Sequence, residues 1–234
     1  LMACNTEPDS RYVIAIGAAA LDEYYTADTW PSEGGKAMVD YKEDMIGGMI
    51  PNAACVFAGY GVHTYLVDTL KNNSKKTDMI VSDLKAHGVK TGLLRYQDDI
   101  PDARTIIILT HRERTILVVE PHKPLLDIKA CELDIFRKAS YIYTTPVELK
   151  NIRNYMEFVD DMKNHHVKLA FDIEASTVDA CDKELIYKGD VLFFNEFGFE
   201  KIKGNRGEEE AFSEMFENGV EIATITLGEK GSFT

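Results

Sequence analysis

Two adjacent glycines and one asparagine form an arrangement that could bind a small polar ligand. Gly47 and Gly48 directly precede a segment of helical composition, and Asn52 falls in its first turn. Glycine permits positive φ angles, and its missing side chain lets a ligand touch the backbone. An asparagine amide donates and accepts hydrogen bonds at once, which suits hydroxyl groups, and a helix amino end adds free N–H donors. A plain turn before a packed helix is the alternative.

A carboxylate lies a few residues after the first apolar segment. This segment, "RYVIAIG" (11–17), ends in glycine, and Asp22 follows it. A carboxylate accepts strong hydrogen bonds from hydroxyl groups, so Asp22 could hold a sugar. An aspartate after a strand also serves as a turn or capping residue, and both interpretations stay open.

Two later segments could bind a nucleotide. Asn195 and Glu196 follow the apolar run "VLFFN", where their oxygen atoms would suit Mg²⁺ or its water shell, although Asn195 could simply cap a helix. The stretch "ATITLGEKG" places Thr226, Gly228 and Gly231 at the end of another apolar run. Such a turn can present backbone N–H groups to phosphate oxygens, or it can merely end a strand.

Alternating strands and helices must position these residues. Buried strands are predicted from β-rich apolar runs at 11–17, 63–68, 141–145, 167–173, 190–195 and 221–228, and a more exposed strand at 37–42. Helices are predicted at 51–61, 77–88, 148–163 and 208–217. Within 77–88, we expect Ile80, Leu84 and His87 to share one face. This alternation predicts a mainly parallel sheet with helices on both faces.

The strands near 24–42 and a hairpin formed by "RTIIILT" and "RTILVVE" do not fit the alternation. They predict a small β flap on one side of the sheet. Ligands of open parallel sheets bind beyond the carboxyl ends of the strands. We therefore expect Gly17 to Asp22, the Gly47–Gly48 loop, Asn195 with Glu196, and Thr226 to Gly231 along one edge.

Composition excludes several classes of protein. The 234 residues carry a formal net charge of −13, which disfavours nucleic acid as a partner. No apolar run reaches membrane-spanning length, so no membrane is expected. The four cysteines form no C-x-x-C pair, which fits a reducing cytoplasm, and Cys55 and Cys131 are predicted to be buried. A phosphate-binding G-x-x-x-x-G-K-[ST] loop and a dinucleotide G-x-G-x-x-G are both missing.

Taken in order, these stretches resemble the ribokinase-like (pfkB) carbohydrate kinase family. "YVIAIGAAALDEYY" is similar to the family's first strand with its sugar-binding aspartate, and "GGMIPNAACVFAGYG" to its G-G-x-x-x-N-x-A signature. "VSDLKAHGV", the hairpin, "FFNEFGFEKIKG" and "TITLGEKGSF" resemble four further family segments, the last at the nucleotide site. The resemblance covers nearly the whole chain from about Arg11.

The resemblance implies a single ribokinase-like α/β domain over 1–234, incomplete at its C-terminus, with lid segments at about 23–46 and 103–120. It implies an ATP-dependent kinase that phosphorylates a hydroxyl of a sugar or sugar-like molecule. The acceptor would be held by Asp22, Gly48 and Asn52. ATP, as co-substrate, and Mg²⁺ would meet Asn195, Glu196, Thr226, Gly228 and Gly231, with no direct protein ligand to the metal. A homodimer through the lid is also implied.

The sequence departs from the family pattern at three places. The family often has asparagine two residues before the sugar aspartate, where this chain has Ala20. The second acid of the family's N-E-x-E falls on Gly198. The family's G-A-G-D signature, which supplies the catalytic base and an anion-binding helix end, lies beyond Thr234, so no catalytic residue is assigned. We therefore expect the chain as given to be incomplete and unable to turn over.

Two other functions stay open at this stage. Gly198 and the missing signature favour a non-catalytic sugar- or nucleotide-binding protein built on the kinase fold. A nicotinamide-dependent oxidoreductase shares the fold class but would need the missing glycine fingerprint. The acceptor is equally open among ribose, fructose, a keto-deoxy acid and a nucleoside.

Overall fold

The computed structural model describes residues 11–111, 113–119 and 122–234, which form a layered body and a projecting second sheet. The body contains a seven-stranded sheet in the order β13-β12-β11-β10-β9-β1-β4. Its strands are β1 (Tyr12–Ile16), β4 (His63–Val67), β9 (Tyr141–Thr144), β10 (Lys168–Ile173), β11 (Val191–Asn195), β12 (Ile222–Thr226) and β13 (Ser232–Phe233). All are parallel except β13, which runs antiparallel to β12. The mainly parallel sheet predicted from the alternation is confirmed.

Helices cover both faces of this sheet because side chains alternate along each buried strand. On β1, Ile14 and Ile16 join one hydrophobic core and Ala15 joins the other. The second core is closed by α1 (Met49–Gly59) and α2 (Lys75–Ala86). The first core is closed by α3 (Leu133–Arg137), α4 (Pro146–Lys150), α5 (Tyr155–Asn164), α6 (Ala175–Ala180), α7 (Lys183–Ile186), α8 (Glu196–Lys203) and α9 (Glu208–Glu217). No helix in the described part of the chain has the length and apolar character needed to cross a bilayer.

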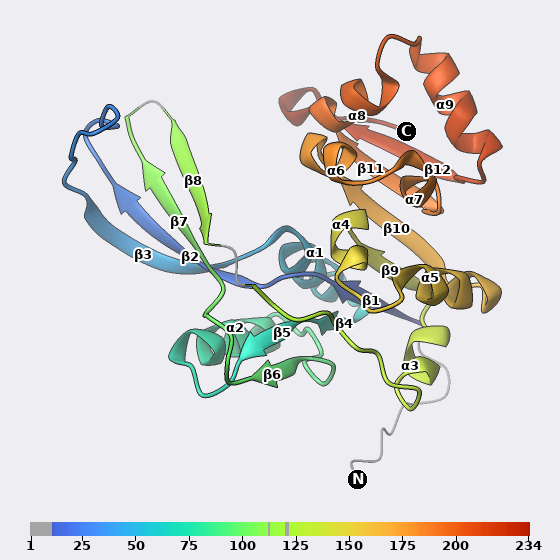
Figure 1. Cartoon of the computed structure of the whole chain (residues 1–234), viewed down its shortest axis with the longest axis horizontal. Coiled ribbons are helices and arrows are strands. Elements are labelled where there is room, and N and C mark those ends of the chain that lie inside the picture. The colour runs from blue at the N-terminus through green and yellow to red at the C-terminus, as the bar shows by residue number, and fades with distance from the viewer. Residues whose placement is uncertain (1–10, 112, 120–121) are drawn as a thin grey trace.

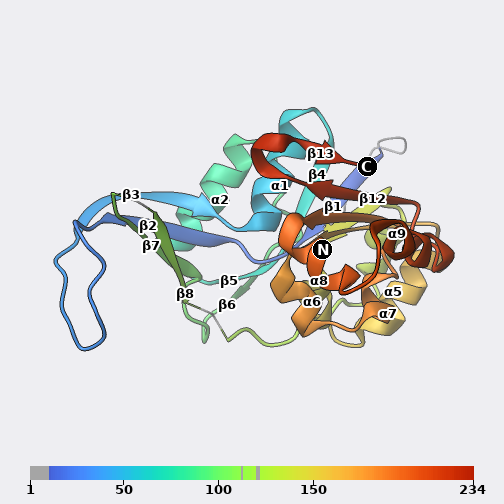
Figure 2. The same cartoon turned by 90° about the horizontal axis from the view of Figure 1, so that it is seen from above.

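The projecting sheet has four strands in the order β3-β2-β7-β8 and is built from two separate excursions of the chain. It lies where the resemblance places a lid, and we use that word as its name. Its strands are β2 (Ala20–Thr26), β3 (Asp40–Gly47), β7 (Arg104–Leu109) and β8 (Arg114–Val119). The antiparallel pair β7–β8 is the expected hairpin. Figures 1 and 2 show this sheet standing away from the layered body, with α2 and a small sheet of β5 (Thr69–Lys71) and β6 (Arg95–Gln97) at its base.

The first excursion starts earlier and ends later than the sequence pattern indicates. We expected the exposed strand at 37–42 and the lid from about residue 23, but β2 begins at Ala20 and β3 runs to Gly47. Asp22 therefore lies within a lid strand instead of in a turn after β1. Its register partners are Met45 on β3 and Thr105 on β7, and this pairing on both sides explains why the segment is extended.

The helix predicted over 148–163 is wrong in its continuity, because α4 and α5 are separate helices. Asn154 has a left-handed φ of 56° between them. The backbone around Ile152 pairs with Leu126 instead: the Leu126 N–H donates to the Asn151 carbonyl at 2.7 Å, and the Arg153 N–H donates to the Leu126 carbonyl at 2.9 Å. Hydrogen bonds to a distant segment thus replace those that a continuous helix would need.

Two side chains lie differently from their predicted placement. His87 was expected within its helix, on one face with Ile80 and Leu84, but the helix ends at Ala86 and the His87 side chain is 55 % exposed. Cys131 is exposed in the turn before α3, whereas Cys55 is half-buried. The apolar pattern around each residue is real, but neither residue lies inside the regular element that would direct it inward.

Candidate functional site

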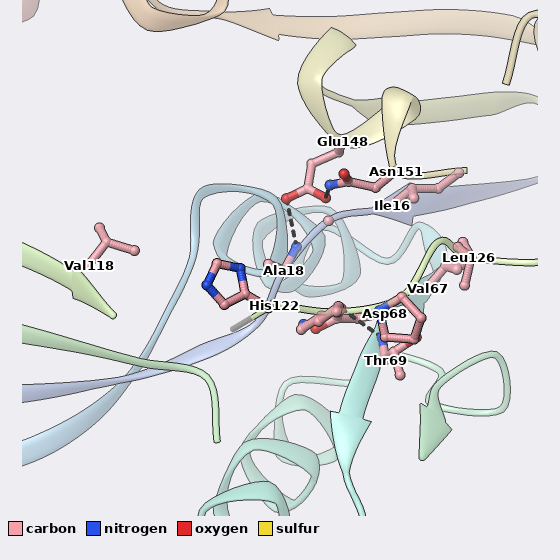
Figure 3. A pocket seen from close by; sticks show the side chains of 13 residues that line it. Ile16, Ala18, Val67, Asp68, Thr69, Val118, His122, Leu126, Glu148 and Asn151 are labelled. Carbon is pink, nitrogen blue, oxygen red and sulfur yellow. Dashed lines mark hydrogen bonds and ion pairs between the residues drawn. The ribbon is translucent and has the colours of Figure 1, made fainter. Parts of the chain in front are cut away.

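A cavity of about 400 Å³ lies at the carboxyl ends of β1 and β4, beside the lid. We call it the rim cavity; Figure 3 shows it from close by. One side is formed by Ile16 at the end of β1 and by the two residues after it, and Val118 of the lid strand β8 lies on the other side. Its polar side chains are Asp68, Thr69, His122, Lys123, Glu148 and Asn151. The cavity therefore occupies the edge of the sheet where ligands of open parallel sheets bind.

The short helix α4 positions two of these polar groups. Thr145 caps the helix by accepting a hydrogen bond from the Glu148 N–H at 3.1 Å, and Pro146 occupies its first turn. The Glu148 carboxylate accepts the Ala18 N–H at 3.2 Å through one oxygen and the Asn151 amide at 3.2 Å through the other (Figure 3). Glu148 thus ties the segment after β1 to α4 while remaining on the cavity wall.

A buried carboxylate forms the opposite wall. Asp68 follows β4 directly and is 8 % exposed. It accepts the Ala19 N–H at 2.9 Å, the Thr69 N–H at 2.7 Å and the Lys123 ammonium group at 2.6 Å. Both of its oxygens are used as acceptors, so this side chain fixes three chain segments around the cavity.

Asp22 and Gly48, two of the residues expected at the acceptor site, lie next to this region but do not line the rim cavity. The Asp22 carboxylate rests against Gly47, where an added methyl group would overlap it. Gly48 has a φ of 108°, and a methyl group there would overlap the carbonyl oxygen of Ala18, which itself lines the cavity. Burial raises the pKa of Asp22, and a hydrogen bond from Thr105 partly offsets this. The glycine pair is therefore required by close packing at this corner.

Asn52 lies in a different place from the other acceptor residues. It is exposed on α1 and lines an open hollow of about 1020 Å³ between α1, α2 and β3, which we call the α1–α2 hollow. Glu23 pairs with Lys76 of α2, so its side chain is on the face of β2 that is turned towards α2. Asp22 is the preceding residue of the strand, and its side chain therefore points to the opposite face. Among the described residues, the structure thus brings Asp22 near Gly48 but does not bring Asn52 into a cavity with either.

A smaller cavity of about 190 Å³ continues along the same edge towards β10. It shares Ala18 and Glu148 with the rim cavity and adds Glu174 and Ser176 around the start of α6. The next strands along the sheet are β11 and β12. Three strand spacings separate β1 from β11, which is about 14 Å. One edge therefore carries hollows at one end and the expected nucleotide residues at the other.

Asn195 and Glu196 lie at the junction of β11 and α8. The Asn195 side-chain oxygen accepts the Gly198 N–H at 2.7 Å, so it caps α8. Glu196 is exposed in the first turn of that helix. A methyl group on Gly198 would lie 2.6 Å from the carbonyl oxygen of Ile173, so the position of the family's second acid is closed by packing. One exposed carboxylate remains at this junction.

Thr226, Gly228 and Gly231 lie at the carboxyl end of β12. Thr226 is the register partner of Asn195 on the adjacent strand, and its hydroxyl donates to the Phe194 carbonyl at 3.2 Å. Gly228 and Gly231 have φ values of 58° and 87° and enclose a tight turn. In this turn the Leu227 N–H donates to the Gly231 carbonyl at 2.8 Å. Asn195, Thr226 and the turn therefore share one end of the edge.

Sequence reasoning missed the side chains that line the rim cavity. Asp68 is the last residue of the predicted strand 63–68, and Glu148 comes soon after the predicted strand 141–145, so the carboxyl-end rule applied to every strand would have found both. His122 and Lys123 carried no such signal, because they reach the cavity only through the path of the chain leaving the lid.

Comparisons with known proteins agree with this architecture. The chain is similar in structure to an Arabidopsis thaliana ribokinase complexed with ribose and ATP, with a TM-score of 0.78 and 20 % identity over 96 % of this chain and 74 % of that one. A Thermotoga maritima ribokinase gives a TM-score of 0.78 and 16 % identity, over 95 % and 73 % of the two chains. A Halothermothrix orenii fructokinase gives 0.75 and 15 %, over 94 % and 81 %.

These identities are low, so the three solved structures establish the fold alone. No significant match was found among curated proteins. The sequence model described as pfkB family carbohydrate kinase matches residues 10–234. Since this match spans almost the whole chain, the protein belongs to the pfkB family of carbohydrate kinases.

Proposed function

We propose that this protein transfers a phosphoryl group from ATP to a hydroxyl of a sugar or sugar-like molecule. The observation that carries the proposal is the continuous edge of the sheet, with polar cavities at the ends of β1, β4 and β9 and a tight glycine-containing turn at the end of β12. The Arabidopsis thaliana neighbour is a complex with ribose and ATP, which supports both substrate classes.

The acceptor would bind in the rim cavity beneath the lid. Glu148, Asn151 and His122 offer both donors and acceptors there, which suits a molecule rich in hydroxyl groups. Asp22 would accept hydroxyl hydrogen bonds at the lid side, and the bare backbone at Gly48 would allow close approach. Lys123 also lines the cavity, and its positive charge would favour an acceptor that carries an acidic group.

ATP would bind at the β11–β12 end of the edge. Thr226, Gly228 and Gly231 would line the nucleotide site, and Asn195 would orient the β11–α8 junction. Mg²⁺ usually keeps several waters and uses one or two carboxylates beside the phosphates. The exposed carboxylate of Glu196 fits that requirement as an acceptor for the metal's waters. Bound Mg²⁺ would offset phosphate charge during transfer.

A thermal-shift panel tests the proposal, because a ligand that binds the folded state raises the melting temperature. We expect one of ribose, fructose, a keto-deoxy acid or a nucleoside to stabilise the chain, and Mg–ATP to stabilise it independently. Glu148→Gln should weaken binding of the phosphoryl acceptor roughly tenfold, because the substitution removes a charged hydrogen-bond acceptor from the cavity wall. The melting temperature of this variant should therefore rise only at higher acceptor concentrations. Glu157→Gln, on the exposed first turn of α5, is the matched control. Failure of every acceptor and of Mg–ATP to shift the melting temperature would overturn the proposal.

Asn52 remains a proposed acceptor contact that rests on the family resemblance. Asn52→Ala should abolish the acceptor shift and leave the ATP shift largely intact if the side chain turns from the α1–α2 hollow to the acceptor. An unchanged acceptor shift would instead assign the acceptor to the rim cavity without Asn52.

A second candidate is a non-catalytic binding protein on the same fold, and the closed position at Gly198 favours it. Both candidates predict ligand-induced stabilisation, and both predict no turnover by a chain that ends at Thr234, so the discriminating observation is the coding sequence that follows this residue. A G-A-G-D-like stretch there, together with acceptor-dependent ADP release by the chain that includes it, supports the kinase, whereas a stop codon there supports the alternative.

The lid is also the proposed surface for a homodimer. Ile116, Leu117 and Val118 on β8 are 47 %, 43 % and 71 % exposed, which is unusual for consecutive apolar residues of a strand. Light scattering should show a dimer that Leu117→Glu dissociates. A monomeric wild-type chain would contradict this assignment.

A further inference from the structure

A cysteine, an aspartate and a histidine meet in the α1–α2 hollow, away from the rim cavity. One ligand atom each from Cys55, Asp83 and His87 lies within 4.8 Å of the other two. Cys55 comes from α1, whereas Asp83 and His87 come from α2 and its final turn. Cys55 is distant in sequence from Asp83 and His87, so the packing of α1 against α2 creates the group.

The histidine is held in an orientation that leaves a ligand atom available. His87 Nδ1 lies 2.9 Å from the Asp83 carbonyl oxygen, one helical turn earlier. When Nδ1 carries the hydrogen and donates it to that carbonyl, Nε2 keeps its lone pair. Metal-binding histidines commonly use this arrangement, because the second hydrogen bond fixes both the ring and its tautomer.

The surrounding hollow favours a cation. Asp44 and Asp78 line it together with Asp83, and the hydroxyl of Ser82 is nearby on the same wall. Cys55 is half-buried, and the side chains of Asp83 and His87 are 39 % and 55 % exposed. A metal ion could therefore reach the group from solvent and keep a water molecule as an additional ligand.

A second aspartate–histidine pair shows what Cys55 adds. His165, at the end of α5, has the same spacing from Asp161, with Nδ1 2.8 Å from the carbonyl oxygen and 3.4 Å from the carboxylate. His87 has matching distances of 2.9 Å and 3.4 Å to Asp83. Within the described ranges, only the pair on α2 faces a cysteine that completes a group of three. The cysteine is thus the feature that separates a metal-binding group from ordinary helix capping.

We propose that Cys55, Asp83 and His87 bind a divalent transition metal of the zinc class, with water completing a four-coordinate site. Thiolate, imidazole and carboxylate are all zinc ligands, and the thiolate makes the set too soft for Mg²⁺ or Ca²⁺. On binding, the sulfur–hydrogen bond of Cys55 breaks, a sulfur–metal bond forms and the proton passes to solvent. The ion then links the two helices that cover one face of the sheet.

The test uses the full chain, stripped of metal, and titrates it with Zn²⁺ and separately with Co²⁺. Calorimetry should show one zinc ion per chain, and cobalt should produce a thiolate-to-metal charge-transfer band. Cys55→Ser should abolish that band, and Cys55→Ser and His87→Ala should each weaken zinc affinity at least about tenfold. Circular dichroism of each metal-free variant establishes that it is folded, and Cys55→Ala gives a second test if the serine variant fails to fold.

Matched controls separate this site from general surface binding. His165→Ala, Cys131→Ser and Cys4→Ser should each keep the cobalt band and the wild-type zinc affinity. Equal zinc affinity in Cys55→Ser, His87→Ala and the three controls would overturn the proposal, as would loss of the band in Cys131→Ser or Cys4→Ser instead of Cys55→Ser.

Discussion

Lys123 and Asp68 form an ion pair of 2.6 Å that joins the chain leaving the lid to the end of β4. Their side chains are only 16 % and 7 % exposed. The pair lies on the wall of the rim cavity, so it fixes the position of the lid's exit relative to the sheet. Asp68 also accepts hydrogen bonds from two backbone N–H groups, so it both pairs with the lysine charge and provides acceptors for buried donors.

Asp68→Asn should destabilise the protein by about 1–3 kcal/mol, because either orientation of the new amide points its NH₂ group at an existing donor. Chemical denaturation measures the free energy of unfolding. Asp160→Asn, which breaks an exposed ion pair with Lys188, is the control and should cost no more than about 1 kcal/mol. Equal losses in the two variants would refute the structural role of Asp68.

Asp22→Asn should weaken acceptor binding and yet stabilise the ligand-free protein at neutral pH. Burial raises the pKa of Asp22 in the folded state. When the pKa of a carboxyl group is higher in the folded than in the unfolded state, its protonation stabilises the folded protein. This contribution is fully present below the unfolded pKa of about 3.9 and is lost as the pH rises through the folded pKa. Melting temperatures from pH 3.5 to 7 should therefore show a growing advantage for Asp22→Asn. A wild type that is the more stable at pH 7 would contradict this.

Gly47→Ala should reduce acceptor affinity without touching the acceptor directly. The added methyl group would overlap the Asp22 carboxylate and displace it. We expect a loss of roughly tenfold or more, equivalent to one charge-assisted hydrogen bond, measured as a shifted acceptor titration. Gly92→Ala, outside the lid, with no left-handed φ and no atom within 4 Å of the added group, is the control for the general effect of replacing a glycine.

Gly198→Glu would restore the family's second acid in sequence but not in structure. Its Cβ would lie 2.6 Å from the Ile173 carbonyl oxygen, so we expect a destabilisation of about 1–3 kcal/mol from overpacking. Phe197→Glu, one residue earlier and 74 % exposed, adds the same charge without the overlap and should be tolerated. If both variants unfold at the same denaturant concentration, packing does not determine the residue at position 198.

The sequence predicted the layered sheet and lid hairpin because both depend on local periodicity. Strands such as 11–17 and 190–195 bury continuous apolar runs, and the helix at 208–217 has its own amphipathic stripe. The break between α4 and α5 was not predictable in this way, since "ELKNIRNYMEF" keeps a helical pattern. It depends on the hydrogen bonds that the Leu126 N–H donates to the Asn151 carbonyl and the Arg153 N–H donates to the Leu126 carbonyl, which only the folded chain brings into reach.

The residues of the candidate site also divide into those that local periodicity could locate and those that it could not. Asp22, Gly48 and Asn195 lie at element ends that the pattern could locate, although Asp22 falls inside a lid strand. His122 and Lys123 belong to no periodic segment, and their place in the rim cavity comes from the return path of the second excursion. Cys55 and His87 look like ordinary helix residues until the packing of α1 on α2 brings them together.

The lid strand β3 ends at Gly47 and α1 begins at Met49, so Gly48 alone separates them. No slack chain is available at this joint to absorb movement. At this connection, a rotation of the lid requires either a change in the φ and ψ angles of Gly48 or a movement of α1 together with the lid. A movement of the lid would then shift the far end of α1, and a metal ion bound between α1 and α2 would limit that shift.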